Sequence, residues 1–150
     1  MAKKQTDTFI KEMNSLVANL NVLYAKVHNY HWYIKGPGFF SLHGKYEEFY
    51  NAIALDLDAV AERVLILGEQ PIASLKEYLD MATIKERKSE PIDTLESVAS
   101  IKEDFLIVSD QIQNLIELTE ELEDDVTNDM MVALKTKYDK YIWMLDSYQK

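Results

Sequence analysis

The sequence predicts an all-α protein, a four-helix bundle formed by a single domain over residues 1–150. Three observations support this class. The chain has only four glycines and three prolines, so long stretches lack the residues that interrupt helices. Apolar residues recur at steps of three and four along four separate stretches, which is the period of one helical face. One long connection separates the second stretch from the third, as in bundles with a crossover.

The first helix is predicted over roughly residues 6–34. Its apolar positions form one face, made of Phe9, Met13, Leu16, Leu20, Leu23, Val27, His31 and Ile34. Gly36-Pro37-Gly38 then ends the pattern, because glycine and proline disfavour a continuing helix.

The second helix is predicted to begin near Ser41, acting as N-cap, and to run to Gly68, with Pro71 just beyond. Its main apolar stripe contains Leu42, Tyr46, Phe49, Ile53, Val60, Val64 and Leu67. A second apolar stripe lies beside it and contains Tyr50, Ala54, Ala61 and Leu65. A surface helix needs only one stripe, and small alanines let two helices approach closely. We therefore expect this helix to associate with a second copy of the chain.

The connection from Ile72 to Ser89 contains the segment SLKEYLDMA, which predicts one short helix. The third helix is expected after Pro91, where Asp93 and Glu96 have the spacing of a capping signal. Its stripe is Leu95, Val98, Phe105, Val108, Ile112, Leu115 and Leu122. An acidic junction over residues 117–129 precedes the fourth helix, which is expected to end with the chain. The face of that helix carries Met131, Leu134, Tyr138, Tyr141, Leu145 and Tyr148.

Composition narrows the range of partners. A net charge of −10 repels nucleic acid and anionic membranes and attracts cations, and Lys3 with Lys4 forms only a small basic tip. The absence of cysteine excludes disulfides, thiolate metal sites and thiol catalysis. Residues 1–14 lack the apolar core of a secretory signal, and no apolar run is long enough to span a bilayer. We therefore expect a cytoplasmic protein without a membrane partner.

A cluster of metal-ligand types stands out in the first half of the chain. All three histidines fall within 16 residues, at His28, His31 and His43. Regularly spaced carboxylates follow at Glu47, Asp58 and Glu62. Imidazole and carboxylate together suit iron, zinc or manganese better than calcium or magnesium, which prefer oxygen ligands alone. The cluster therefore predicts a transition-metal site.

Helical geometry constrains how these ligands can meet. At about 100° and 1.5 Å per residue, His43, Glu47, Asp58 and Glu62 share one side of the second helix, the side of its second apolar stripe. Glu47 and Asp58 are nevertheless about 16 Å apart along the axis, too far to share one ion. Two copies packed antiparallel about a twofold axis would place His43 and Glu47 of one copy opposite the later carboxylates of the other. His31 would flank the His43 end of each site.

Simpler interpretations exist for single residues. A lone histidine in an apolar stripe is usually a hydrogen-bonded core residue, and spaced acids are usually solvated. We assign that structural role to His28, which turns about 60° away from His31. Trp32 and Tyr50 are interpreted as packing residues. No Glu-x-x-His pair occurs, although ordinary di-iron bundles use such pairs within one subunit.

Several motifs closely resemble the signature of Dps proteins, the mini-ferritins of the ferritin-like superfamily. They are His28-Asn29-Tyr30-His31-Trp32, Gly36-Pro37, Phe39-Phe40, Leu42-His43, Glu47, Asp58, Ala61-Glu62-Arg63, Thr127-Asn128-Asp129 and Trp143-Met144-Leu145. The resemblance covers the whole chain in helix order, including the short helix in the connection. It implies a ferritin-like hollow dodecamer that oxidises ferrous iron with hydrogen peroxide, or more slowly with O2, at ferroxidase centres shared between twofold-related subunits. Ferric mineral would be stored inside.

The resemblance also implies roles for individual residues. His31 and His43 match the iron ligands from one subunit, and Asp58 and Glu62 match those from its partner. Glu47 matches an acidic position beside the centre, which leaves direct binding of a second iron open. Zinc is the expected competitor for these ligands.

Four further residues match positions outside the ligand set. Trp32 matches a tryptophan near the centre that passes or traps electrons. Glu121, Asp125 and Asp129 look like the carboxylates lining the threefold pores through which iron enters, and rings of negative charge concentrate cations. The alternative is that these acids simply flank helix ends, where some favour the N-terminus of the next helix.

Two other functions remain open at this point. Some members of the resembled family bind and compact DNA, usually through basic tails, so the chain could be a DNA-binding protective protein with iron oxidation secondary. Its charge and short Lys3-Lys4 tip predict weak DNA binding that falls steeply with salt. A helical interaction module with a structural zinc would bind metal without turnover.

Overall fold

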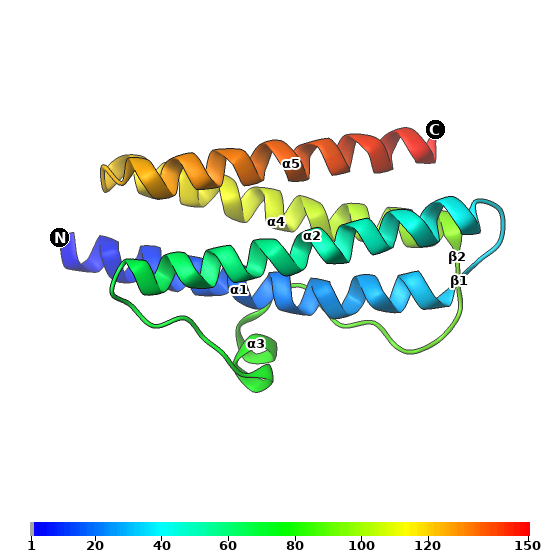
Figure 1. Cartoon of the computed structure of the whole chain (residues 1–150), viewed down its shortest axis with the longest axis horizontal. Helices are drawn as coiled ribbons and strands as arrows, with labels where there is room; N and C mark the ends of the chain where they lie inside the picture. Colours follow the sequence, from blue (N-terminus) through cyan, green and yellow to red (C-terminus); the bar gives the residue numbers. More distant parts are fainter. Residues whose placement is uncertain (1) are drawn as a thin grey trace.

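The computed structural model describes residues 2–150 and confirms the predicted four-helix bundle (Figure 1). The long helices are α1 (Ala2–Tyr33), α2 (Phe39–Ile66), α4 (Thr94–Glu121) and α5 (Asp125–Gln149). The short helix α3 (Leu75–Met81) lies in the connection between α2 and α4, as the sequence predicts. Helix α1 pairs with α2, and α4 pairs with α5. The connection between α2 and α4, called the crossover below, returns to the opposite end of the bundle. Helix α4 therefore runs in the same direction as α2.

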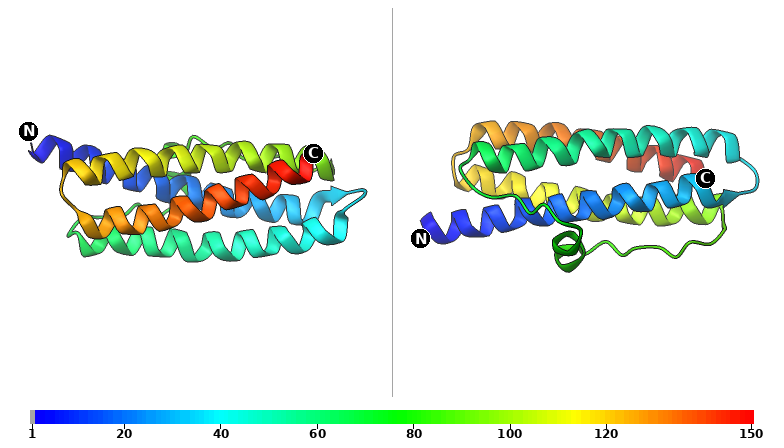
Figure 2. Two further views of the ribbon diagram at one scale, coloured as in Figure 1. Left: turned by 90° about the horizontal axis from the view of Figure 1, so that it is seen from above. Right: turned by 60° about the horizontal axis from the view of Figure 1, so that its bottom comes forward.

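The crossover runs along the outer side of α1 (Figure 2) and is held there by two features that the sequence analysis did not predict. Strand β1 (Ile34–Lys35) pairs in parallel with β2 (Ile92–Asp93), which joins the end of α1 to the residues just before α4. Two-residue strands are too short to leave a periodic pattern in the sequence.

The second feature is a set of asparagines on α1 that bond to the crossover backbone. The Asn14 Oδ1 atom accepts from Ile72 N at 2.9 Å. Asn19 is fully buried, and its Oδ1 atom accepts from Thr83 N at 2.8 Å and from Ile84 N at 2.9 Å. Asn29 Nδ2 donates to the carbonyl oxygen of Lys88 at 3.1 Å. These bonds satisfy backbone groups of a segment that has little secondary structure of its own.

The start of α2 differs from the prediction. Gly38, not Ser41, is the N-cap, with φ 85°, a left-handed conformation that glycine adopts without steric cost. A Cβ atom at Gly38 would also lie 1.9 Å from the Tyr148 hydroxyl oxygen. The end of α2 follows the prediction more closely: Gly68 has φ 83°, and Glu69 N donates to Val64 O at 3.1 Å, completing a Schellman motif.

The predicted capping signal before α4 is only half correct. The helix does begin directly after Asp93, but the Asp93 side chain makes no capping hydrogen bond. Asp93 instead belongs to β2 and pairs with Lys35, so its backbone is fixed by the strand pair. The acidic junction is also shorter than its run of charge suggests, because α4 continues to Glu121 and α5 begins at Asp125.

The core lies between the four long helices and confirms most of the predicted stripes. Its largest fully buried side chains include Tyr30, Tyr46, Tyr138, Phe49 and Phe105. The buried tyrosine hydroxyls find partners: Tyr46 bonds Ser97 Oγ at 2.6 Å, and Tyr138 donates to Asp56 Oδ2 at 2.8 Å. Leu95 and Tyr148 are wrong assignments, because their side chains are 58% and 39% exposed.

The second stripe of α2 is less covered than the first. Tyr50, Ala54 and Ala61 are half-buried, and Leu65 is 59% exposed. Leu55 and Ile66 on the same helix are also exposed. We call Leu55, Leu65 and Ile66 the α2 apolar surface. Within residues 2–150 the structure has no helix long and apolar enough to cross a membrane.

Candidate metal centre

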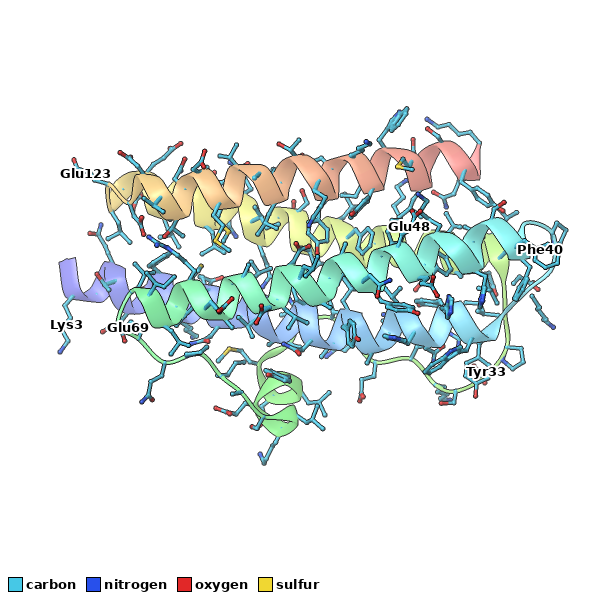
Figure 3. All side chains as sticks on the ribbon, viewed as in Figure 1. Lys3, Tyr33, Phe40, Glu48, Glu69 and Glu123 are labelled. Carbon is cyan, nitrogen blue, oxygen red and sulfur yellow. The ribbon has the colours of Figure 1, made fainter. Side chains whose placement is uncertain are left out.

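The two histidines predicted to bind metal from one subunit lie face to face. His31 is in the last turn of α1 and His43 in the second turn of α2, and the turn at Gly38 folds the helices against each other. The imidazole rings are nearly parallel, with centroids 3.7 Å apart and an interplanar angle of 11°. The pair lies at the end of the bundle marked by Tyr33 and Phe40 (Figure 3).

Reciprocal hydrogen bonds fix both rings. His31 Nδ1 donates to the carbonyl oxygen of His43 at 2.6 Å, and His43 Nδ1 donates to the carbonyl oxygen of His31 at 2.8 Å. A carbonyl oxygen can only accept, so each Nδ1 carries a proton. In the neutral ring, Nε2 then keeps its lone pair and is free to bind a metal ion. The backbone therefore selects the tautomer that a metal ligand needs.

Burial also favours the neutral form of His31. The residue is 6% exposed, and loss of solvation lowers the pKa of its imidazole, although the bond to the His43 backbone and the charge of Glu47 oppose this shift. The ring of Phe39 stacks on His43 at a centroid distance of 5.1 Å. His31 is thus held in an environment that disfavours its imidazolium form, and Phe39 packs on the ring of its partner, His43.

Glu47 lies one helical turn after His43 and is bonded to a tyrosine. The Tyr50 hydroxyl donates to Glu47 Oε1 at 3.3 Å. The Tyr50 ring stacks on His28 at 3.8 Å and meets His31 edge-on at 5.3 Å. From the sequence we expected only a packing role for Tyr50, although the i, i+3 spacing of Glu47 and Tyr50 on a helix could have indicated this bond.

The remaining aromatic residues surround His28 and not the stacked pair. His28 Nδ1 donates to the carbonyl oxygen of Tyr24 at 2.8 Å, which agrees with the structural role predicted for this histidine. Trp32 is 68% exposed, and its ring lies 5.3 Å from that of His28. Its proposed redox role stays a prediction.

The later carboxylates of α2 lie away from the histidines. Asp58 and Glu62 are both exposed, and the helical rise places them about 16–22 Å along the axis from Glu47. Within residues 2–150, no three His, Asp or Glu side chains are close enough to hold one ion. The single chain therefore brings His31 and His43 together and leaves their predicted carboxylate partners free on the surface of α2.

The acids predicted to line a pore lie at the other end of the bundle, around the turn marked by Glu123 (Figure 3). Glu121 is the last residue of α4, Asp125 is the first of α5, and Asp129 follows one turn later. All three are exposed. Within the chain the three acids are thus grouped around one turn, and their role in a pore stays a prediction.

The bundle also contains a buried acid that the sequence analysis missed. Asp56 is 5% exposed and bonds both Lys137 and Tyr138 across to α5. It lies on the buried side of α2, three residues after Ile53 and four before Val60. A carboxylate at a core position of an apolar stripe was the available signal, because such a group needs an internal partner.

The fold and the histidine pair define the class of protein to which the chain is similar. A family model described as "Ferritin-like domain" matches residues 10–150. General stress protein 20U of Bacillus subtilis is 42% identical over 144 residues, which cover 95% of this chain and 98% of that protein. The DNA protection during starvation protein of Listeria innocua is 39% identical over 140 residues, covering 91% and 88%.

Solved structures give the same result. Dps from Staphylococcus aureus has a TM-score of 0.90 and 42% identity, with 95% of each chain covered. Antigen TpF1 from Treponema pallidum has a TM-score of 0.96 and 35% identity, with 98% of this chain and 94% of that chain covered. The chain belongs to the Dps family of ferritin-like proteins.

Proposed function

We propose that this protein oxidises ferrous iron at centres shared between two subunits and stores the ferric product inside its assembly. His31 and His43 of one subunit and Asp58 and Glu62 of the partner subunit would bind the iron. The observation that carries the proposal is the reciprocal histidine pair, because it leaves both Nε2 atoms available, while no complete set of ligands comes together within residues 2–150 of one chain.

The donor set fits the proposed substrate. Imidazole nitrogen together with carboxylate oxygen suits iron, and also zinc, which is expected to compete. Among similar proteins, Dps from Vibrio cholerae is described as a member of a broad superfamily of ferritin-like diiron-carboxylate proteins. Dps from Listeria innocua is described as soaked with zinc in one structure and with cobalt in another.

Iron supplies the redox chemistry, and the protein supplies position and charge. Two ferrous ions each lose one electron, and hydrogen peroxide takes up both electrons and two protons to give two molecules of water. O2 would be the slower oxidant. Because both electrons reach one peroxide molecule, hydroxyl radical is not released, so the benefit would be protection as well as storage.

A homo-oligomer is part of the proposal, because the ligands of one centre come from two copies. The α2 apolar surface provides the apolar contact that a twofold pair needs. The hollow dodecamer is the assembly that the family resemblance implies.

Stopped-flow oxidation of ferrous iron by hydrogen peroxide, and separately by O2, tests the proposal. We expect fast peroxide-driven turnover in the wild type and its loss in an Asp58→Ala, Glu62→Ala double variant that assembles normally. The matched control is Glu69→Ala, Asp110→Ala, which removes two other exposed acids and should retain wild-type rates. Equal rates in wild type and the first variant would overturn the proposal. Loss of assembly would show that Asp58 and Glu62 chiefly hold the interface.

A DNA-protective role is the second candidate, favoured by the names of relatives such as DNA protection during starvation protein 2 of Bacillus anthracis, which is 37% identical. Lys3 and Lys4 are exposed, but the net charge of −10 opposes binding to phosphates. Gel shifts at low and moderate salt, with and without magnesium, separate the two functions. A shift that persists at moderate salt would favour DNA binding.

A further inference from the structure

We infer that Tyr50 is a positioning residue, whose hydroxyl orients the Glu47 carboxylate so that Glu47 can bind a second metal ion beside the histidine pair. This inference rests on the proposed function. Tyr50 is not one of the metal ligands named above. The inference gives a function to its hydrogen bond with Glu47, which the packing of the ring does not require.

The first support is the geometry of the bond. Tyr50 donates to Glu47 Oε1, which leaves Oε2 without that contact. A carboxylate that binds a metal ion through one oxygen commonly accepts a hydrogen bond on the other, and this partner fixes its orientation. The donor is also suited to the task, because a phenol has one O–H group to donate to a carboxylate oxygen.

The second support is the rigidity of the Tyr50 ring. It is stacked on His28 with an interplanar angle of 20° and is edge-on to both His31 and Tyr24. Glu47 itself is an exposed side chain, so it would lose rotamer freedom on binding a metal ion. Because the Tyr50 ring is held by three aromatic neighbours, its hydroxyl restricts the Glu47 side chain before metal binds. Such preorganisation raises the affinity for the metal ion.

The third support is the location of Glu47. Its hydrogen-bond partner Tyr50 meets the His31 ring edge-on at a centroid distance of 5.3 Å. Glu47 is also one helical turn from His43. Glu47 is therefore placed near both histidines, and within residues 2–150 no complete site forms in one chain. His28 contributes through its stacking on Tyr50, which gives this histidine a supporting role.

Cobalt(II) binding tests the inference, because cobalt(II) reports affinity without turnover. Calorimetric titration of the assembled protein gives the number of sites per chain and the affinity of each. We expect two classes of site in the wild type, and Tyr50→Phe should weaken the Glu47-dependent class by about tenfold. Tyr24→Phe is the matched control, since it removes a hydroxyl from a ring 6.2 Å from Tyr50, and it should bind like the wild type.

A double-mutant cycle separates positioning from packing. If Tyr50 acts through Glu47, then adding Tyr50→Phe to Glu47→Gln should cause no further loss of cobalt affinity. An unchanged affinity in Tyr50→Phe, or an equal loss in the Glu47→Gln background, would overturn the role of Tyr50 while leaving the proposed function intact. A wild type that binds no cobalt would overturn both. Tyr50→Phe keeps the ring and its contacts, and circular dichroism with size measurement confirms that it folds and assembles.

Discussion

At the residue scale, the histidine pair shows how the backbone prepares a metal ligand. Each ring gives its Nδ1 proton to the carbonyl oxygen of the other residue. Because each acceptor is a backbone carbonyl, replacing one histidine would remove its ring from the stacked pair but leave the other ring its hydrogen bond. Sequence spacing predicted that His31 and His43 would lie near the same site, but not that each would orient the other. That result depends on carbonyl directions around the Gly38 turn, which no residue pattern encodes.

A different residue, Asn19, is expected to matter most for the stability of the crossover. Replacing it by alanine leaves the backbone N–H groups of Thr83 and Ile84 without their partner in a buried site, so we expect a loss of about 2–4 kcal/mol in the free energy of unfolding. Chemical denaturation at fixed protein concentration measures it. Asn21→Ala is the control, because Asn21 bonds only within its own helix, to Val17 O. A similar small loss in both variants would contradict the prediction.

At the scale of elements, the sequence predicted the helices better than their ends. An apolar face that continues over seven or eight turns determines that a helix forms, because burying each of its many side chains adds to the stability. A helix end depends on one or two residues and on their neighbours in space. Ser41 has the right side chain for an N-cap, yet Gly38 holds that position because the tight turn and the nearby Tyr148 hydroxyl leave room for no side chain.

The end of α2 is tied to the turn between α4 and α5 by a small polar cluster. Arg63 Nε donates to Thr127 Oγ1 at 2.8 Å, and Arg63 Nη2 donates to Asp124 Oδ1 at 3.3 Å. Thr127 N also donates to Asp124 Oδ1 at 3.0 Å. The residue after the candidate ligand Glu62 therefore contacts the turn that carries the proposed pore acids. This link would keep those two regions in a fixed relation within each subunit.

This cluster predicts a dependence of stability on pH. Burial would raise the pKa of the Asp124 carboxyl, but bonds from Thr127 and Arg63 lower it more, to below its ordinary value of 3.8. A depressed pKa in the folded state contributes stability above the unfolded value, and this contribution is lost as the pH falls through the folded value. Asp124→Asn should therefore be less stable than wild type at pH 7, with a difference that shrinks below about pH 4.

Denaturation curves from pH 3 to pH 7 measure that difference. Asp110→Asn serves as the control, because Asp110 is exposed and away from the cluster. A difference between wild type and Asp124→Asn that stays constant over this range would show that the charge of Asp124 contributes nothing to stability.

At the scale of the whole molecule, the acidic residues fall into two groups. Some form ion pairs inside the bundle, such as Asp104, whose Oδ2 lies 2.8 Å from Lys26 Nζ in a buried site. Others, including Asp58 and Glu62, are exposed on α2. The sequence alone could give the total charge but not this division, because pairing depends on which helices face each other. The exposed acids are the ones available to cations and to a second copy of the chain.

The acids at the α4–α5 turn give the last prediction. If Asp125 and Asp129 guide iron into the assembly, then Asp125→Asn, Asp129→Asn should slow ferrous oxidation several-fold at low ionic strength, because local negative potential raises the concentration of cations. The deficit should shrink as salt screens the charges. Cobalt affinity at the histidine centre should not change, since that centre lies at the opposite end of the bundle.

The control for this prediction is Asp7→Asn, Asp110→Asn, which changes the net charge by the same amount at exposed positions elsewhere. Stopped-flow rates over a range of salt concentrations compare the three proteins. If both variants slow oxidation equally, the effect comes from total charge, and the turn has no special part in iron entry. If only the turn variant is slower, and only at low salt, the place of those two carboxylates decides the rate, and the turn between α4 and α5 collects iron for the centres that α1 and α2 form.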